Sequence, residues 1–511
     1  MKTIVFTLSG SLLLGIGICH STAESNWPTW RGPSAAGTAE GKPPIEWDAK
    51  KNVKWKVAIP GRGMSTPIIW GDKVFVLTAV GTGPKKETPA GAQRGSGGGG
   101  RPSFGGGNRG SSSGGQRPSS GGFNREEFMK RFDTNKDGEL SEKEREAMRA
   151  QFRRGGSGGR SSGGRGRGGR GGFSMSEAPT QAQKFTVVAL DRKTGKALWE
   201  QSARQEFPHE GHHRDHGFAS SSPVTDGKTL FVSFGSRGIY AYTLDGKKLW
   251  EKQLGKMRTR AGFGEGASPA LTEKALIVLW DHEDQSFIVA LDKKTGKELW
   301  RKNRDEQTSW TTPVIVKVNG QEQIIVSGAK ATRSYAANNG EVIWEASGLT
   351  QNVIPTPVIG HGLAYVMSGF RGTALQAIKL TAKGDVTDGK DIAWSYDRST
   401  PYVPSPVLSG NRLYFHKSNS AFLSCLDAKT GKPIYLDERL EGIRGIYASP
   451  LAANGHLYVV GREGTSLALK DSDKLEIVAT NKIDEKMDAS PVIVGDQLFL
   501  RGHQHLYCIA K

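Results

Sequence analysis

The chain has 511 residues and a formal net charge of +19 at pH 7. That length excludes a small domain with one simple core and requires several domains or a large repeat architecture. The charge by itself suggests an acidic partner, but the segment 84–180 holds 19 Lys and Arg residues against 10 Asp and Glu residues, about half of the excess. The rest of the chain is therefore only moderately basic, and its charge does not identify a partner.

Residues 1–23 have the layout of a secretory signal peptide. An apolar run from Ile4 to Ile18 is followed by small residues, which predicts cleavage near Ala23. A lipid anchor on Cys19 is the alternative, and the large Ile18 before it disfavours that alternative. No later run is long and apolar enough to span a bilayer. We therefore expect a periplasmic or secreted protein without a transmembrane segment.

The segment 24–83 is expected to contain a short strand around Trp55 and the first two strands of a repeating unit. The segment 84–180 is predicted to be an insertion into that unit. Its two arms are rich in Gly, Ser and Arg and cannot bury enough apolar surface to fold, so we expect them to be flexible. An Arg-Gly run at 165–172 is similar to RNA-binding segments, but an exported protein rarely meets RNA, and we expect no nucleic-acid partner.

Between the two arms, residues 124–153 are predicted to form a helical EF-hand. Calcium prefers six to eight oxygen ligands, and an EF-hand loop supplies them at fixed positions around a glycine, here Gly138. The predicted calcium ligands are Asp133, Asn135, Asp137, the Glu139 carbonyl, Ser141 directly or through water, and Glu144 with both oxygens. A lone EF-hand without a partner hand should bind calcium weakly.

The segment 181–511 repeats one pattern, which is clearest in Phe287–Trp300, FIVALDKKTGKELW. An alternating strand, a turn and a second strand predict a hairpin that cannot bury its apolar face alone, so the copies must pack together. A Ser or Thr followed by Pro and an apolar strand recurs eight times along the chain, at Thr66, Ser222, Ser268, Thr312, Thr356, Ser405, Ser449 and Ser490.

From Pro223 onward these markers are 41 to 49 residues apart, the period of a β-propeller blade. We predict an all-β fold, an eight-bladed β-propeller of four-stranded blades with the small EF-hand inserted. The last unit has room for three strands, so the strand around Trp55 is expected to close the ring. Six units end in a tryptophan, which we interpret as packing between adjacent blades. These tryptophans are Trp55, Trp199, Trp250, Trp300, Trp344 and Trp394.

The pattern Ala-Leu-Asp-x-x-Thr-Gly-Lys-x-x-Trp resembles the pyrroloquinoline-quinone-like (PQQ-like) propeller repeat. Quinoprotein dehydrogenases, the outer-membrane assembly lipoprotein and exported planctomycete-type proteins contain this repeat. The resemblance implies either a quinone-dependent enzyme or a non-catalytic propeller. Those dehydrogenases use adjacent cysteines and a Glu/Asn/Asp calcium site, and neither is identifiable in this sequence. We therefore do not expect PQQ as a cofactor. The expected cofactor is the calcium ion of the predicted EF-hand.

One face of the ring is predicted to bind ligands, because the turn after the second strand of each blade opens on the same face as the loops between blades. In six units this turn carries a cation, and in the third it is acidic. The predicted ligand face consists of Arg237, Asp281, His282, Arg333, Arg371, Lys417, Arg462 and Arg501.

A histidine-rich loop, Phe207–Phe218, is predicted to open on the same face. Zinc needs three or four converging ligands, which such a loop can supply. A solvated loop is the favoured alternative, because no helix or strand fixes the spacing. The candidate metal ligands are His209, His212, His213 and His216, which Asp281 and His282 could join near the axis.

These features together predict an exported, non-catalytic propeller that acts as a binding or scaffold module with a calcium-binding insertion. We expect a monomer whose partner is a protein or an anionic cell-surface polymer. The alternative is a PQQ-dependent dehydrogenase of alcohols or sugars, since fold alone does not define chemistry.

Overall fold

The computed structural model describes residues 26–86 and 176–511. These two ranges belong to the larger of the two units into which the chain divides. The predicted calcium loop at 133–144 and the predicted signal peptide lie outside the described residues. Everything below concerns the larger unit.

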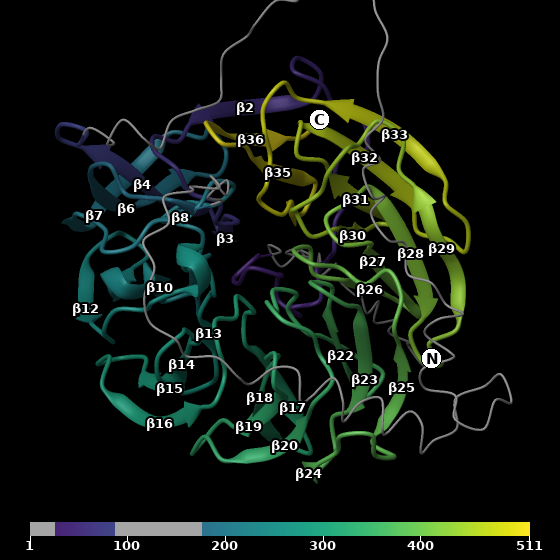
Figure 1. Ribbon diagram of the computed structural model, residues 1–511. Helices are drawn as coiled ribbons and strands as arrows, with labels where there is room; N and C mark the ends of the chain where they lie inside the picture. Colours follow the sequence, from purple (N-terminus) through teal and green to yellow (C-terminus); the bar gives the residue numbers. More distant parts are fainter. Residues whose placement is uncertain (1–25, 87–175) are drawn as a thin grey trace, which may run out of the picture. The chain divides into compact units, whose positions relative to one another are not determined.

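Eight antiparallel sheets stand side by side in a ring (Figure 1). The first four blades follow the chain, with the insertion falling between β4 and β6. Their strands are β3 (Ile68–Trp70), β4 (Lys73–Thr82), β6 (Ala182–Asp191), β7 (Ala197–Glu206); β9 (Val224–Thr225), β10 (Thr229–Ser233), β11 (Ile239–Thr243), β12 (Lys248–Lys252); β13 (Ala270–Leu271), β14 (Ala275–Trp280), β15 (Ser286–Asp292), β16 (Glu298–Arg304); and β17 (Val314–Val318), β18 (Gln321–Val326), β19 (Thr332–Ala336), β20 (Val342–Ala346) with the added β24 (Gly384–Asp385).

The remaining four blades complete the ring. The first two strands of the chain, β1 and β2, join the seventh and eighth blades. The strands of these four blades are β21 (Val358–Gly360), β22 (Leu363–Ser368), β23 (Ala374–Lys379), β25 (Ile392–Tyr396); β26 (Val407–Ser409), β27 (Arg412–His416), β28 (Phe422–Asp427), β29 (Pro433–Arg439); β30 (Leu451–Ala453), β31 (His456–Val460), β32 (Thr465–Lys470), β33 (Ile477–Lys482) with β1 (Thr38–Ala39); and β34 (Val492–Val494), β35 (Gln497–Arg501), β36 (His505–Ile509) with β2 (Val53–Ala58). The eight four-stranded blades predicted from the sequence are thus confirmed.

The hairpin at Phe287–Trp300 shows why this sequence forms strands. All but the last residue of the middle strand β15 are buried, whereas the outer strand β16 largely alternates exposed and half-buried residues. In the turn, Thr295 donates backbone and hydroxyl hydrogen bonds to Asp292 Oδ1 at 2.8 and 2.7 Å. Gly296 follows with φ 68°, a conformation that favours glycine. The predicted hairpin is therefore confirmed, and its Asp-x-x-Thr-Gly turn is built from local hydrogen bonds.

Ring closure also agrees with the prediction. The N-terminal strand β2 pairs antiparallel with the C-terminal strand β36, with Trp55 opposite Cys508. This pairing gives the last blade its fourth strand and removes the open edge at the junction.

The tryptophans at the blade ends connect each blade to the next one. Trp300 donates from Nε1 to the Ala337 carbonyl of the following blade at 3.0 Å. Its ring covers Gly340, where an added Cβ would lie 2.6 Å away from it. Trp55, Trp199, Trp250 and Trp394 make the same contact with a carbonyl of the next blade. Packing between blades, as predicted, is their structural role.

Trp344 departs from this arrangement. Its Nε1 has no hydrogen-bond partner among the described residues, and its ring is fully buried. The turn of the fifth blade is longer here, and its short strand β24 pairs in parallel with β20, placing Gly384 opposite Trp344. Pairing with the added strand β24 thus takes the place of the Nε1-to-carbonyl hydrogen bond that the other blade-end tryptophans make.

The eight Ser/Thr-Pro markers form a closed circle of hydrogen bonds around the axis. The backbone N–H of each marker donates to the hydroxyl of the marker in the next blade, over 2.9 to 3.3 Å. The donors run in order through Thr66, Ser222, Ser268, Thr312, Thr356, Ser405, Ser449 and Ser490, and the last of them donates to Thr66 Oγ1. Each marker therefore precedes the inner strand of its own blade and also connects that strand to the inner strand of the next blade.

Helical structure is minor in the larger unit. Within residues 26–86 and 176–511 there is no α-helix, only the 3₁₀ turns η1 (Gly235–Arg237) and η2 (Arg260–Gly262). Consequently no helix in these ranges has the length and apolar character that a membrane span needs.

Candidate ligand funnel on the ring axis

The N-terminal segment forms the floor of a central cavity. Trp27 exchanges backbone hydrogen bonds with Ile69 in the first blade, at 2.8 and 2.9 Å. A few residues later, Arg31 donates to the carbonyls of Pro406 and Pro450, which precede the sixth and seventh blades. The segment therefore crosses the axis, and it is visible in purple inside the ring in Figure 1. Trp30, between these anchors, lines the cavity from below.

Arg31 is held by backbone carbonyls and has no carboxylate partner among residues 26–86 and 176–511. Its guanidinium is 3% exposed and donates to Pro450 at 2.9 Å, to Pro406 at 2.7 Å and to Ala36 at 3.4 Å. Burial lowers the pKa of Arg31 to about 9, so the side chain still carries its charge at neutral pH. Its hydrogen bonds therefore attach the N-terminal segment to the sixth and seventh blades.

Above this floor lies a funnel of about 440 Å³, a size common among ligand sites. Hydroxyls of the marker circle form part of its wall. Six aromatic residues contribute to the lining, and each remains only half-buried. They are Trp30, Phe263, Trp310, Phe370, Tyr402 and Tyr447.

The histidine-rich loop lies across the mouth of the funnel. Its short strand β8 (His212–His213) pairs with β5 (Ser176–Glu177), and the His213 N–H donates to the Phe263 carbonyl between the second and third blades at 2.9 Å. At the other end, Asp215 forms an ion pair with Arg462 of the seventh blade at 3.0 Å. These anchors lie on nearly opposite sides of the ring, so the loop spans the opening.

A charged network fixes one wall of the mouth. Arg462 binds both oxygens of Asp488 at 2.6 and 3.2 Å in addition to Asp215, and it stacks 3.8 Å from the Tyr447 ring centroid. His503 Nε2 lies 3.0 Å from Asp488 Oδ2. Burial alone would raise the pKa of the two aspartates, but hydrogen bonds from their partners outweigh it and lower both values. The carboxylates are therefore ionised, and the single guanidinium of Arg462 pairs with both of them.

The four loop histidines do not converge on one point. His209 lies 2.7 Å from the Met257 carbonyl, while His212 packs edge-on against Phe218 and His213 against Phe263. Burial lowers the pKa of His212 and His213, and it lowers that of His216 to about 4. Over the part of the chain that the structure describes, no three His, Cys, Asp or Glu side chains form a metal-binding group.

The cations of the predicted ligand face have separate surroundings. Arg333 is paired with Asp305, Glu306 and Glu345, and Lys417 is paired with Asp437. Of the remaining cations, Arg462 is half-buried in the charged network at the mouth. Arg237 and Arg501 are buried, whereas Arg371 is exposed beside the Phe370 ring.

Arg501 resembles Arg31 in its environment. It donates to the Ser65 and Leu77 carbonyls, each at 2.7 Å, and burial lowers its pKa to about 9. It joins the eighth blade to the first. The structure therefore does not present the predicted cations as one free positive surface.

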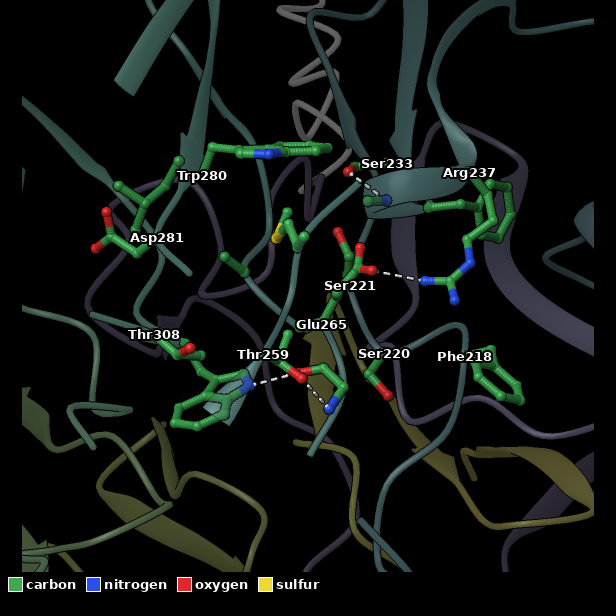
Figure 2. A pocket seen from close by; sticks show the side chains of 18 of the residues that line it. Phe218, Ser220, Ser221, Ser233, Arg237, Thr259, Glu265, Trp280, Asp281 and Thr308 are labelled. Carbon is green, nitrogen blue, oxygen red and sulfur yellow. Dashed lines mark hydrogen bonds and ion pairs between the residues drawn. The ribbon is translucent and has the colours of Figure 1, made fainter. Parts of the chain in front are cut away.

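A second, much smaller pocket lies beside the funnel between the second and third blades (Figure 2). Arg237 and Glu265 pair there at 2.7 Å. Asp281 also lines this pocket and binds Arg304 at 2.7 Å, so it does not join the histidine loop. His282 instead accepts a hydrogen bond from the Arg258 backbone. With about 30 Å³, this pocket has room for ordered water rather than for a ligand.

The funnel does not match the quinone that its repeat pattern implies. Pyrroloquinoline quinone is a polycarboxylate, so its site needs cations that face it. The carboxylates of Asp215 and Asp488 line the cavity instead, and Arg462 is already occupied by both of them. Arg214 also lines it, but that residue lies exposed at the mouth. No catalytic step is derived through this cofactor.

The eight sheets form an eight-bladed β-propeller with PQQ-like repeats, and the N-terminal segment closes one end of its axial funnel. The family model described as outer membrane protein assembly factor BamB matches residues 132–279, 183–434 and 284–511. The chain belongs to this family.

One similar protein carries the same description as the family model, and two others differ from it. The assembly factor BamB of Moranella endobia (strain PCIT) is 24% identical over 335 residues, which cover 62% of this chain and 78% of the relative. Subunit 1 of the ER membrane protein complex of Xenopus laevis is 34% identical over 104 residues, 19% of this chain, and the chain spans only 10% of that relative. A europium-containing methanol dehydrogenase superposes with a TM-score of 0.52 at 8% identity, covering 93% of this chain and 89% of that one, a likeness of fold alone.

Sequence reasoning missed the funnel, although a signal for it was present. In every blade, the residue three places before the marker proline lines the cavity. These residues are Met64, Ser220, Gly266, Trp310, Ile354, Val403, Tyr447 and Asp488. The position is fixed relative to the inner strand, so aligning the eight markers would have identified it.

Proposed function

We propose that this protein is an exported, non-catalytic propeller that binds a ligand in its axial funnel. The observation that carries this proposal is the funnel itself, which has a fixed floor at Trp30, a half-buried aromatic wall and a loop across its mouth. Pockets of this kind, mostly apolar with a few placed polar groups, are typical binding sites.

An envelope location accompanies this proposal. The predicted signal peptide at 1–23 favours export, and the family is described as an outer membrane protein assembly factor. We propose that a protein or an anionic surface polymer contacts the outside of the ring or the basic insertion, since the funnel itself is lined by the carboxylates of Asp215 and Asp488.

Calcium binding by the insertion is a further part of the proposal. Titration of the full-length protein with calcium should give a dissociation constant of about 10⁻⁴ to 10⁻³ M. Glu144→Gln should weaken binding about tenfold or more, because it removes a bidentate ligand. Glu142→Gln is the matched control, since position 142 supplies no ligand, and calcium affinity equal in both variants would refute the assignment.

The second candidate function is a quinone-dependent dehydrogenase, and Asp488 is the observation that favours it. An ionised carboxylate held by Arg462 and His503 at the wall of a pocket can accept a proton from a bound substrate. Purified protein incubated with PQQ and calcium should show no cofactor absorbance and no dye-linked oxidation of alcohols or sugars. Sustained turnover in this assay would contradict the non-catalytic binding function and support the dehydrogenase.

A further inference from the structure

The innermost positions of the funnel differ in chemistry around the ring. Trp310 precedes the fourth blade and Asp488 precedes the eighth, so in an eight-membered ring they lie on opposite sides of the axis. Trp310 is fixed by a hydrogen bond from Nε1 to the Gly264 carbonyl at 2.7 Å. Gly266 beside it has no side chain, and a Cβ added there would lie 3.0 Å from His216 Nε2 and 3.5 Å from the Trp310 ring, so the glycine lets His216 pack against this wall. A ligand on the axis thus meets a flat aromatic ring on one side and a carboxylate on the other.

The polar groups of the wall offer both acceptors and donors. Asp488 binds Arg462 and His503, but a carboxylate oxygen can accept more than one hydrogen bond. Asn419 accepts from the Val403 N–H through Oδ1 at 2.9 Å, and its amide N–H groups have no partner among the described residues. A ligand that satisfies both groups must itself carry donors and acceptors.

Charge restricts the ligand further. The carboxylates of Asp215 and Asp488 share the single guanidinium of Arg462, so this wall keeps negative charge while both carboxylates are already paired. A polyanion would meet these carboxylates at the wall, and a cation would compete with an existing ion pair. A neutral ligand avoids both costs.

We infer that the ligand of the funnel is a neutral oligosaccharide. One sugar ring stacks its apolar C–H face on Trp310, and its hydroxyls donate to Asp488 and accept from Asn419. A sugar combines a flat apolar face with paired donors and acceptors and carries no charge. This inference rests on the proposed binding function and names its ligand class.

The test is titration of the full-length protein with cellohexaose, mannohexaose and chitohexaose, followed by calorimetry and tryptophan fluorescence. Polygalacturonate and the apolar dye ANS serve as comparison probes. At least one neutral hexasaccharide should bind and alter the fluorescence. Trp310→Ala should weaken its binding by about tenfold or more, through loss of the stacking face. Leu299→Ala, an exposed apolar residue on the outer strand β16 and outside the funnel, is the matched control and should change it by less than about twofold.

Asn419→Ala provides a second variant that leaves the aromatic wall intact. It should weaken sugar binding about threefold or more, and it should also lower the melting temperature modestly because the Val403 N–H loses its acceptor, so the titrations are run well below that temperature. Failure of all neutral sugars, with ANS or polygalacturonate bound in a Trp310-dependent manner, would overturn the sugar inference and keep the binding function. Failure of every probe would overturn both. Sugar binding unchanged in both variants would also refute the proposed site.

Discussion

Replacing Arg304 by methionine is expected to lower the free energy of unfolding by about 3–5 kcal/mol. The side chains of Arg304 and Asp281 are both fully buried and joined by two hydrogen bonds of 2.7 and 3.1 Å. Removing the cation leaves Asp281 with only Ser309 as a side-chain partner. Chemical denaturation of both proteins, monitored by tryptophan fluorescence, measures the difference.

The matched control for this substitution is Arg301→Ala on the same strand, β16. Arg301 forms a half-exposed pair with Glu298, which contributes only about 0.5 kcal/mol or less. Arg304→Met/Asp281→Asn should recover part of the loss, because the unpaired charge disappears. Equal free energies of unfolding for the Arg304 and Arg301 variants would show that the buried pair does not make the expected contribution to stability.

Replacing Arg31 by methionine is expected to cost about 2–3 kcal/mol and to free the floor of the funnel. The carbonyls of Pro406 and Pro450 would lose a charged donor while staying buried, and this loss exceeds the relief of no longer burying an unpaired cation. Trp30 should then become more mobile, since its neighbour no longer holds it against two blades. The measurements are the denaturation midpoint and the rate of limited proteolysis within residues 26–41.

Lys42→Met is the control for Arg31, because Lys42 is an exposed cation at the end of the same segment. It should change neither the midpoint nor the proteolysis rate. Proteolysis equally fast in the wild-type protein and the Arg31 variant would show that Arg31 does not hold the segment.

Most of the propeller could be predicted because its signals are local. The alternation in Phe287–Trp300 and the Asp292–Thr295–Gly296 turn act within one hairpin, and the structure forms that hairpin as expected. The incomplete last blade required a fourth strand, and the strand around Trp55 is the one that supplies it. These conclusions need only strand periodicity, turn chemistry and counting.

The candidate site was less accessible to such reasoning. Arg501 and Arg333 were both assigned to the turn after the second strand, but Arg501 ends the second strand β35 and donates to buried carbonyls, whereas Arg333 lies in the third strand β19 and meets three carboxylates. A turn position predicts on which face a residue lies, but the neighbouring blade determines its partners. Similarly, the histidines of Phe207–Phe218 attract attention in the sequence, whereas Asp215 anchors that loop.

The sequence by itself determined the number of blades, their order and the closing strand, because each depends on a short repeated pattern of burial and turns. Only the tertiary structure decided that Trp30 closes one end of the axis and that Trp310 lies opposite Asp488. These contacts join residues far apart in the chain, and they exist only after eight blades have closed into a ring. The physical reason is that a blade's strands are specified locally, while the chemistry on the axis is the sum of one residue from each blade.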